Sequence, residues 1–242
     1  MTPLHSSCAL TGATNLPTRY ITVTLALCAV GLAGIYLATH AIDLECMTRS
    51  CEFTQQLLDM NGEGNLPAWF TVACWFLAGI LAYFIAQVDE TPHQHAAWYG
   101  IMVLSLFFSF DEMTMFHESF GSILGSSIGK ITGVGDILFY KWLVYGVMFV
   151  VVAGLLFLPF LYRLPRSTRW RIIMAGTIFL IGALGIESLG AASQAGMIDL
   201  VQGRVWPFAI ALEETLEMLG VILLIHALLH HLSWATDRKL PL

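Results

Sequence analysis

Six long apolar stretches constrain the fold of this chain more strongly than any other feature of its sequence. Each has roughly 20–25 residues, the length that an α-helix needs to cross a hydrocarbon core of about 30 Å. Charged residues make up 12% of the chain, whereas soluble domains carry about 25%. The sequence therefore predicts an all-α polytopic membrane protein, a six-transmembrane-helix bundle that forms one membrane domain over residues 1–242, with spans near 20–40, 66–88, 97–116, 137–161, 172–192 and 205–229.

The loop between the fourth and fifth spans carries four arginines and no acidic residue. Cytoplasmic loops of membrane proteins are enriched in Arg and Lys, so this loop is predicted to be cytoplasmic. Both termini then lie in the cytoplasm of a bacterial-type inner (plasma) membrane, and the acidic loop 41–65 lies outside. The first span is too long for the apolar region of a cleaved signal peptide, so we expect it to remain. The four arginines are Arg163, Arg166, Arg169 and Arg171.

The outer loop 41–65 contains two cysteines and one predicted helix. Cys46 and Cys51 lie five residues apart, and a disulfide between them fits a loop that faces an oxidising compartment. Residues 53–60 have the pattern of a short amphipathic helix on the membrane surface. We therefore expect this loop to be locally structured.

The loop after the third span has a regular glycine spacing. Glycines recur at every fourth position, with serines between them. If the segment is helical, the glycines form a smooth stripe for close packing against a second copy or a partner subunit. If it is not helical, the segment is a flexible outer hairpin. The four positions are Gly121, Gly125, Gly129 and Gly133.

The spans contain seven carboxylates. Each ionised acid near the bilayer centre costs at least about 2.5–3.5 kcal/mol on the insertion scale. A metal ion, protons or the single intramembrane lysine, Lys141, must therefore neutralise them. The acids are Asp111, Glu112, Glu118, Glu187, Glu213, Glu214 and Glu217, and His117 lies among the first group.

These groups are predicted to lie at one depth. With a rise of 1.5 Å per residue, Asp111 and Glu187 lie roughly 20 Å from the inner ends of their spans. The acids of the last span, which runs inward, lie roughly 12–18 Å below the outer surface, and Lys141 lies at a similar level. The sequence therefore predicts one acidic cluster in the outer half of the membrane.

Helical angles rank the members of the cluster. The three glutamates of the last span fall within an arc of about 100°, so they share one face, which should point into the bundle. Asp111 and Glu118 are seven residues apart and nearly eclipsed. Glu112 and His117 flank them by about 100–120° on either side, so we expect one of these two at the rim.

Carboxylates with one imidazole and no thiol are typical ligands of divalent Fe, Mn or Zn. The leading hypothesis is a metal-dependent membrane enzyme, either a hydrolase or an oxidoreductase, that acts on a lipid-like substrate entering from the bilayer. His117 would complete the metal site or act as a general base. The main ligand candidates are Asp111, Glu118, Glu187, Glu214 and Glu217.

Three other interpretations stay open. The acids could form a cation- or proton-coupled transport site, although Ser105, Thr177 and His226 are the only polar candidates in the inner halves of these spans. They could be protonated groups that hold helices together. The chain could also be a non-catalytic subunit of a membrane complex. Binding of nucleic acid is not expected, because the sequence has no basic patch.

Two residue types near the inner ends of the spans are expected at the membrane interface. Trp98 lies near the start of the third predicted span, where tryptophans form aromatic belts. His230 and His231 follow the end of the sixth predicted span. All three are therefore expected to contact the interfacial region rather than the core.

Overall fold

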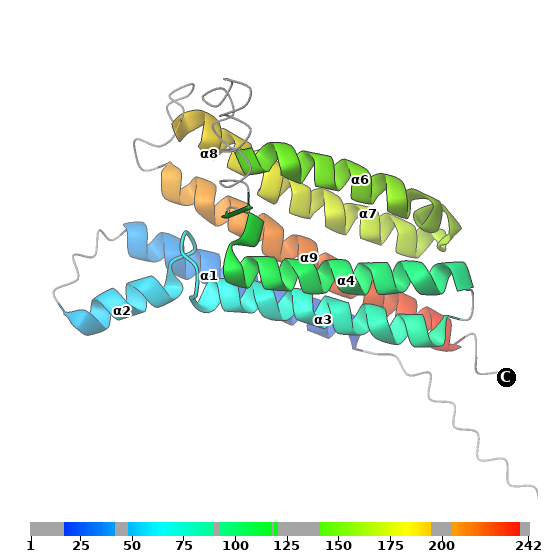
Figure 1. Cartoon of the computed structure of the whole chain (residues 1–242). Coiled ribbons are helices and arrows are strands. Elements are labelled where there is room, and N and C mark those ends of the chain that lie inside the picture. Colours follow the sequence, from blue (N-terminus) through cyan, green and yellow to red (C-terminus); the bar gives the residue numbers. More distant parts are fainter. Residues whose placement is uncertain are drawn as a thin grey trace, which may run out of the picture.

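The computed structural model describes residues 17–41, 48–89, 92–117, 119–120, 141–194 and 205–237, and every regular element within these residues is helical. The all-α prediction is confirmed. Figure 1 shows the long helices running side by side along one direction. The elements are α1 Thr18–Ala41, α2 Arg49–Leu58, α3 Leu66–Val88, α4 Pro92–Thr114, α6 Lys141–Arg163, α7 Arg166–Leu180, η1 Ile181–Ile186, α8 Glu187–Gln194 and α9 Trp206–Asp237.

Four helical segments are long and apolar enough to cross a membrane. They support the prediction of a membrane protein directly. Helices α4 and α9, which carry five of the predicted site acids that the structure describes, are not among the four. The segments are Thr18–Ala41, Leu66–Val88, Tyr145–Arg163 and Arg166–Gly190.

Polar caps and prolines determine where several helices begin. The Thr48 side chain accepts a hydrogen bond from the N–H of Cys51 at 3.3 Å, so α2 starts earlier than the predicted helix 53–60. Asn65 caps α3 in the same way, by accepting from the N–H of Ala68 at 3.0 Å. Pro165 precedes α7, where its missing N–H removes no intrahelical bond.

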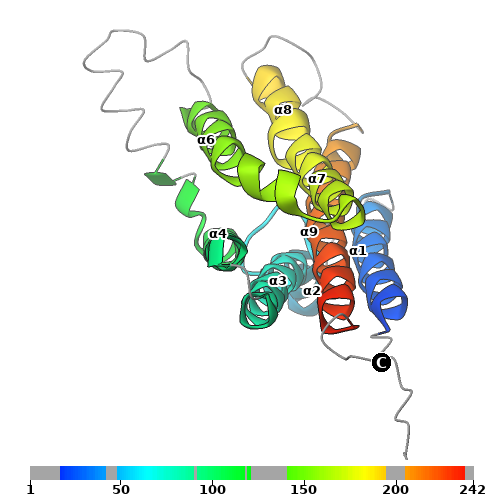
Figure 2. The same ribbon diagram turned by 90° about the vertical axis from the view of Figure 1, so that its right-hand side faces the viewer.

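Helix α9 lies at the centre of the bundle. It packs against α1, α3, α7 and η1, and the end-on view in Figure 2 shows these elements around it. Its contact with α7 is close, since a Cβ on Gly220 would lie 2.6 Å from the Cβ of Phe179. Small residues allow membrane helices to approach in this way.

Helix α4 packs along α3, whereas α6 is loosely held. A Cβ on Gly79 of α3 would lie 3.1 Å from Leu106 of α4, so these two helices meet closely. Helix α6 makes few contacts with α4 and η1, and most of its apolar side chains are exposed. The side of the bundle between α4 and α6 is therefore incompletely packed.

Trp98 and His231 lie in the core, so their predicted interfacial positions are wrong. Their exposed fractions are 0% and 1%, and their rings lie 4.8 Å apart. Trp98 Nε1 donates to Asp89 at 3.1 Å, and His231 Nδ1 lies 3.2 Å from the Thr168 hydroxyl. The reason is helix packing: Phe160 of α6 and His231 of α9 cover the Trp98 ring, and His231 in turn lies against Trp98 of α4 and Thr168 of α7.

Two predictions on the loops rest on residues outside the described part of the chain. The glycines at 121, 125, 129 and 133 lie there, and so does Cys46. Cys51 lies in the first turn of α2. The disulfide and the glycine docking surface therefore stay predictions.

Candidate functional site

A cavity of about 290 Å³ lies at the end of the bundle that the sequence analysis assigns to the outer side. Its walls come from α3, α4, α6, α7, η1, α8 and α9. Aromatic and aliphatic side chains form most of its surface. The ionisable lining residues are Asp111, Glu112, His117, Tyr145, Glu187 and Glu217.

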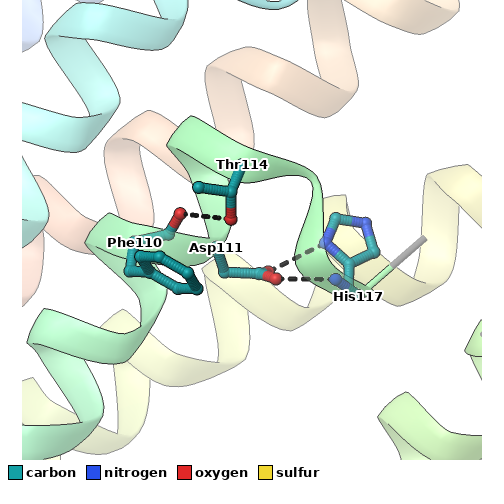
Figure 3. A network of polar contacts seen from close by, with 4 residues as sticks. All are labelled: Phe110, Asp111, Thr114 and His117. Carbon is teal, nitrogen blue, oxygen red and sulfur yellow. Dashed lines mark hydrogen bonds and ion pairs between the residues drawn. The ribbon is translucent and has the colours of Figure 1, made fainter. Parts of the chain in front are cut away.

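Asp111 fixes the position of His117. Helix α4 ends at Thr114, and Met115 adopts a φ of 51°, in the left-handed region that turns the chain. One oxygen of the buried Asp111 accepts from the His117 backbone N–H at 2.8 Å, and the other lies 2.8 Å from Nδ1 of the ring (Figure 3). A carboxylate can only accept, so Nδ1 donates, and in the neutral ring Nε2 carries the lone pair.

This turn changes the predicted ranking of the α4 residues. The angles above assume a helix that continues to Glu118, which places Glu112 or His117 at the rim. Because α4 ends at Thr114, that assumption does not hold for His117. Asp111, Glu112 and His117 all line the cavity. Glu118 lies outside the described residues.

Glu187 is positioned by a π-helical turn. Element η1 connects α7 to α8, and the backbone N–H of Glu187 bonds to the carbonyl of Gly182. One extra residue in such a turn rotates the following side chains by roughly 100° relative to a regular helix. This rotation, which the hydropathy pattern does not reveal, sets the direction of Glu187 in the cavity wall.

Gly182 also brings η1 close to α9. A Cβ at Gly182 would lie 2.8 Å from the Glu213 carbonyl oxygen and 2.9 Å from Cγ of Glu217. No larger residue fits there without a shift of the α9 backbone. The glycine therefore allows Glu187 and Glu217, from two different helices, to line the same cavity.

Glu213 and Glu214 extend the acidic region toward the outer loop. Glu217 is the α9 glutamate that lines the cavity. The carboxylate of Glu214 interacts electrostatically with those of Glu213 and Glu63, and the buried Tyr36 lies within reach of the charge of Glu214. Glu63 lies in the acidic outer loop 41–65, and its part in this region was not predicted from the sequence. Its position in a loop on the same side of the membrane was the available signal.

Tyr145 is a second residue that the sequence analysis missed. It lies on α6 and lines the cavity, four residues after Lys141 and thus one helical turn further along. Lys141 is the first residue of α6, and the position of its side chain is not described. The helical spacing from Lys141 was the available signal for Tyr145.

The described ionisable side chains line the cavity, but they do not point at one common position inside it. In the part of the chain that the structure describes, no group of three or more His, Cys, Asp and Glu side chains is arranged to hold a metal ion. Mutual repulsion favours separation of neighbouring carboxylates. Metal binding would therefore require the glutamate side chains to rotate inward, which their several side-chain torsions allow.

The fold and the cavity define an all-helical protein with membrane-type helices and an acidic cavity at one end of the bundle. The chain belongs to the family described as Domain of unknown function (DUF8692), which matches residues 20–232. No curated protein and no solved structure matches it.

Proposed function

We propose that this protein crosses a bacterial-type inner membrane six times, with α4 and α9 as the two further spans. Helix α4 has 23 residues and α9 has 32, and at 1.5 Å per residue about 20 residues suffice for a core of about 30 Å. Thr22 near the start of α1 contacts His226 in the second half of α9 at 3.0 Å. This contact supports N- and C-terminal helix ends on one side, which the arginine-rich loop assigns to the cytoplasm.

We propose further that the acidic cavity binds one or more divalent metal ions, with Fe, Mn or Zn favoured. The observation that carries this proposal is the convergence of four carboxylates and one imidazole on one cavity from α4 and the turn after it, η1–α8 and α9. No Lys or Arg occurs among the described residues that line it. Carboxylates that share a largely apolar cavity repel one another, and a bound divalent ion would offset that repulsion.

The function that this site supports best is that of a metal-dependent enzyme acting on a lipid-like substrate. Glu112, Glu187 and Glu217 would bind the ion, and Glu118 and Glu214 are neighbouring ligand candidates. Asp111 would keep Nδ1 of His117 protonated, so Nε2 would accept a proton from water or from a substrate hydroxyl. A bound divalent ion would supply Lewis-acid activation at the same place.

A cation- or proton-coupled transporter is the second candidate. Its support is the number of acids in the outer half of the bundle. A transport path also needs polar groups toward the inner side, yet the space next to the cavity is lined mainly by apolar side chains. This arrangement favours a site reached from one side. Ion flux in proteoliposomes that disappears in Glu217→Gln would support transport instead.

Two smaller proposals accompany the site. A Cys46–Cys51 disulfide would stabilise the outer loop, and the glycines at 121–133 would supply a contact for a second copy or a partner subunit. A non-catalytic subunit would co-purify with a stoichiometric second protein. Pull-down of the full chain distinguishes that alternative from an enzyme acting alone.

The proposal is tested with the purified full chain loaded with Mn²⁺, Fe²⁺ or Zn²⁺ and incubated with a total bacterial lipid extract. We expect at least one tightly bound ion per chain and new lipid products detected by mass spectrometry, both lost after chelation. Glu52→Gln on exposed α2 is the control for Glu217→Gln. The proposal would be contradicted if the unmodified chain neither bound metal nor formed new lipid products.

A further inference from the structure

An apolar chamber adjoins the acidic cavity. It has a volume of about 330 Å³ and is lined from α3, α4, α6, α7 and α9, with Ser105 and Thr177 as its polar side chains among the described lining residues. Trp75, Phe108 and Phe179 line both the chamber and the acidic cavity. The two spaces are therefore neighbours that share an aromatic wall.

These shared aromatic rings form a collar between the two spaces. The ring centroids of Trp75 lie 4.8 Å from Phe108 and 5.2 Å from Phe179. Phe149 of the loosely packed α6 lies beside these rings, with its centroid 6.1 Å from that of Phe108. One end of a ligand at the collar would meet carboxylates, and its other end would meet only apolar surface.

The chamber also borders a groove that opens sideways between α4 and α6. This groove measures about 830 Å³ and shares Phe157 and Phe160 with the chamber. Val103 of α4 and Leu156 of α6 line it and are 59% and 74% exposed. In the proposed membrane orientation these side chains face hydrocarbon, so the groove gives lipid chains a lateral route to the chamber.

The distance from the acidic cavity to the far end of the chamber matches one hydrocarbon chain. Glu112 in the acidic cavity and Ile101 in the chamber are eleven residues apart on α4, which corresponds to roughly 16 Å along the helix. One leaflet contributes about 15 Å of the 30 Å hydrocarbon core. Both volumes are at the lower end of the range of about 300–1,000 Å³ for small-molecule sites, so the space fits one chain better than two.

We propose that the chamber binds the hydrocarbon chain of a single-chain membrane amphiphile whose headgroup, an amine, amide or hydroxyl, lies at the acidic cavity. This inference rests on the proposed function and names its substrate class. The chain would enter through the groove between α4 and α6 and extend past the aromatic collar. The headgroup would then lie beside His117 and the cavity carboxylates.

The charge of the cavity argues against a phosphate headgroup. Four carboxylates line it, and each one that is ionised would repel a phosphate group. Proteins usually bind phosphate through Arg or Lys side chains or through helix N-termini. The described lining residues include neither Arg nor Lys, whereas a cationic amine or a neutral headgroup avoids the repulsion.

Two glycines allow the chamber to be filled without disturbing the bundle. Gly154 of α6 and Gly176 of α7 line the chamber, and a Cβ on either would meet no atom within 4 Å. Gly154→Leu and Gly176→Leu therefore place a side chain in open space. Gly34→Leu is the matched control, since Gly34 of α1 has equally open surroundings and lies outside the chamber.

The test uses a photoreactive hexadecylamine with a diazirine in its chain, added to the full chain in phosphatidylcholine nanodiscs. We expect cross-links at chamber residues of α4, α6 and α7, competed by hexadecylamine and hexadecanol. Gly176→Leu and Gly154→Leu should weaken labelling about tenfold, as expected for the loss of about two buried methylene groups. Gly34→Leu should label like the unmodified chain, and circular dichroism verifies folding of each variant.

Three outcomes would overturn the inference. These are unchanged labelling in both folded chamber variants, cross-links confined to the lipid-facing surface, and equal competition by phosphatidic acid. Metal content is measured on the same samples. Normal metal binding without chamber labelling would refute the substrate class alone, whereas specific labelling of a chain that binds no metal would refute the metal site.

Discussion

The two halves of α9 have very different surroundings, although they belong to one continuous helix. In the half assigned to the outer side, Glu213, Glu214 and Glu217 are only partly buried. Further inward along the helix, Met218, Val221, Ile222, Ile225 and Leu228 have exposed fractions of 0–1%. The same helix thus provides a site wall at one end and a packed core at the other.

The neighbours of each half explain the difference. Along its inner half, α9 is enclosed by α1, α3 and α7, and Trp98 and Trp234 contact its His231. Near Glu217 one wall comes from the loosely packed α6. The comparison teaches that the candidate site lies where helix packing is incomplete, which is where a metal ion or ligand has space.

Removal of one cavity carboxylate should have the largest effect. Glu217→Gln keeps the shape of the side chain but removes the charge, so we expect metal affinity to fall by at least about 100-fold, more than the loss typical of an outer-shell partner. Equilibrium dialysis measures this change. Glu52→Gln, on the exposed face of α2, should bind metal normally. Equal metal affinity of the two variants would contradict the assignment of Glu217 as a metal ligand.

Loss of the Asp111 charge should have the next largest effect. Asp111→Asn can still accept the His117 backbone N–H but no longer stabilises the donating Nδ1. We expect metal affinity to fall by about 10–100-fold, as for other residues that orient a ligand. Asp237→Asn, at the exposed end of α9, serves as the control in the same assay. A larger loss in Asp237→Asn than in Asp111→Asn would contradict the role of the pair.

A matched pair of glycine substitutions compares tight with open packing directly. A Cβ on Gly220 would lie 2.7 Å from the Cα of Phe179, whereas Gly176 has no atom within 4 Å. Gly220→Ala should lower the free energy of unfolding by about 1–3 kcal/mol through overpacking. Gly176→Ala should leave it unchanged or raise it slightly. Thermal unfolding in detergent measures both, and equal melting temperatures would show that the two contacts do not differ.

The smallest effect is expected at a helix cap. Asn65 caps α3 and its side-chain amide also donates to the Asp59 carbonyl at 2.6 Å. Asn65→Ala should lower stability by about 1 kcal/mol without changing metal affinity. Thermal unfolding and dialysis on one sample separate the two properties. If Asn65→Ala lost metal binding, the metal site would have to include part of the outer loop.

Hydropathy predicted where the long helices lie, because a long apolar stretch marks each of them. It predicted both α4 and α9 to be shorter than they are. Polar residues such as His231 continue a helix when the side chains of neighbouring helices cover them. The acids of the cavity were also predicted from the sequence. The turn at Met115 and the π-helical turn before Glu187 were not, because both break the regular 100° rotation on which angular predictions depend.

The most direct test of the account is an X-ray absorption spectrum of the metal bound to the full chain. The account predicts a first shell of oxygen and nitrogen donors at about 2.0–2.2 Å without sulfur, altered both in Glu187→Gln and in Glu217→Gln. Because these residues come from different helices, a change in both variants would establish one shared site. A shell that contains sulfur, or that stays the same in both variants, would contradict the account.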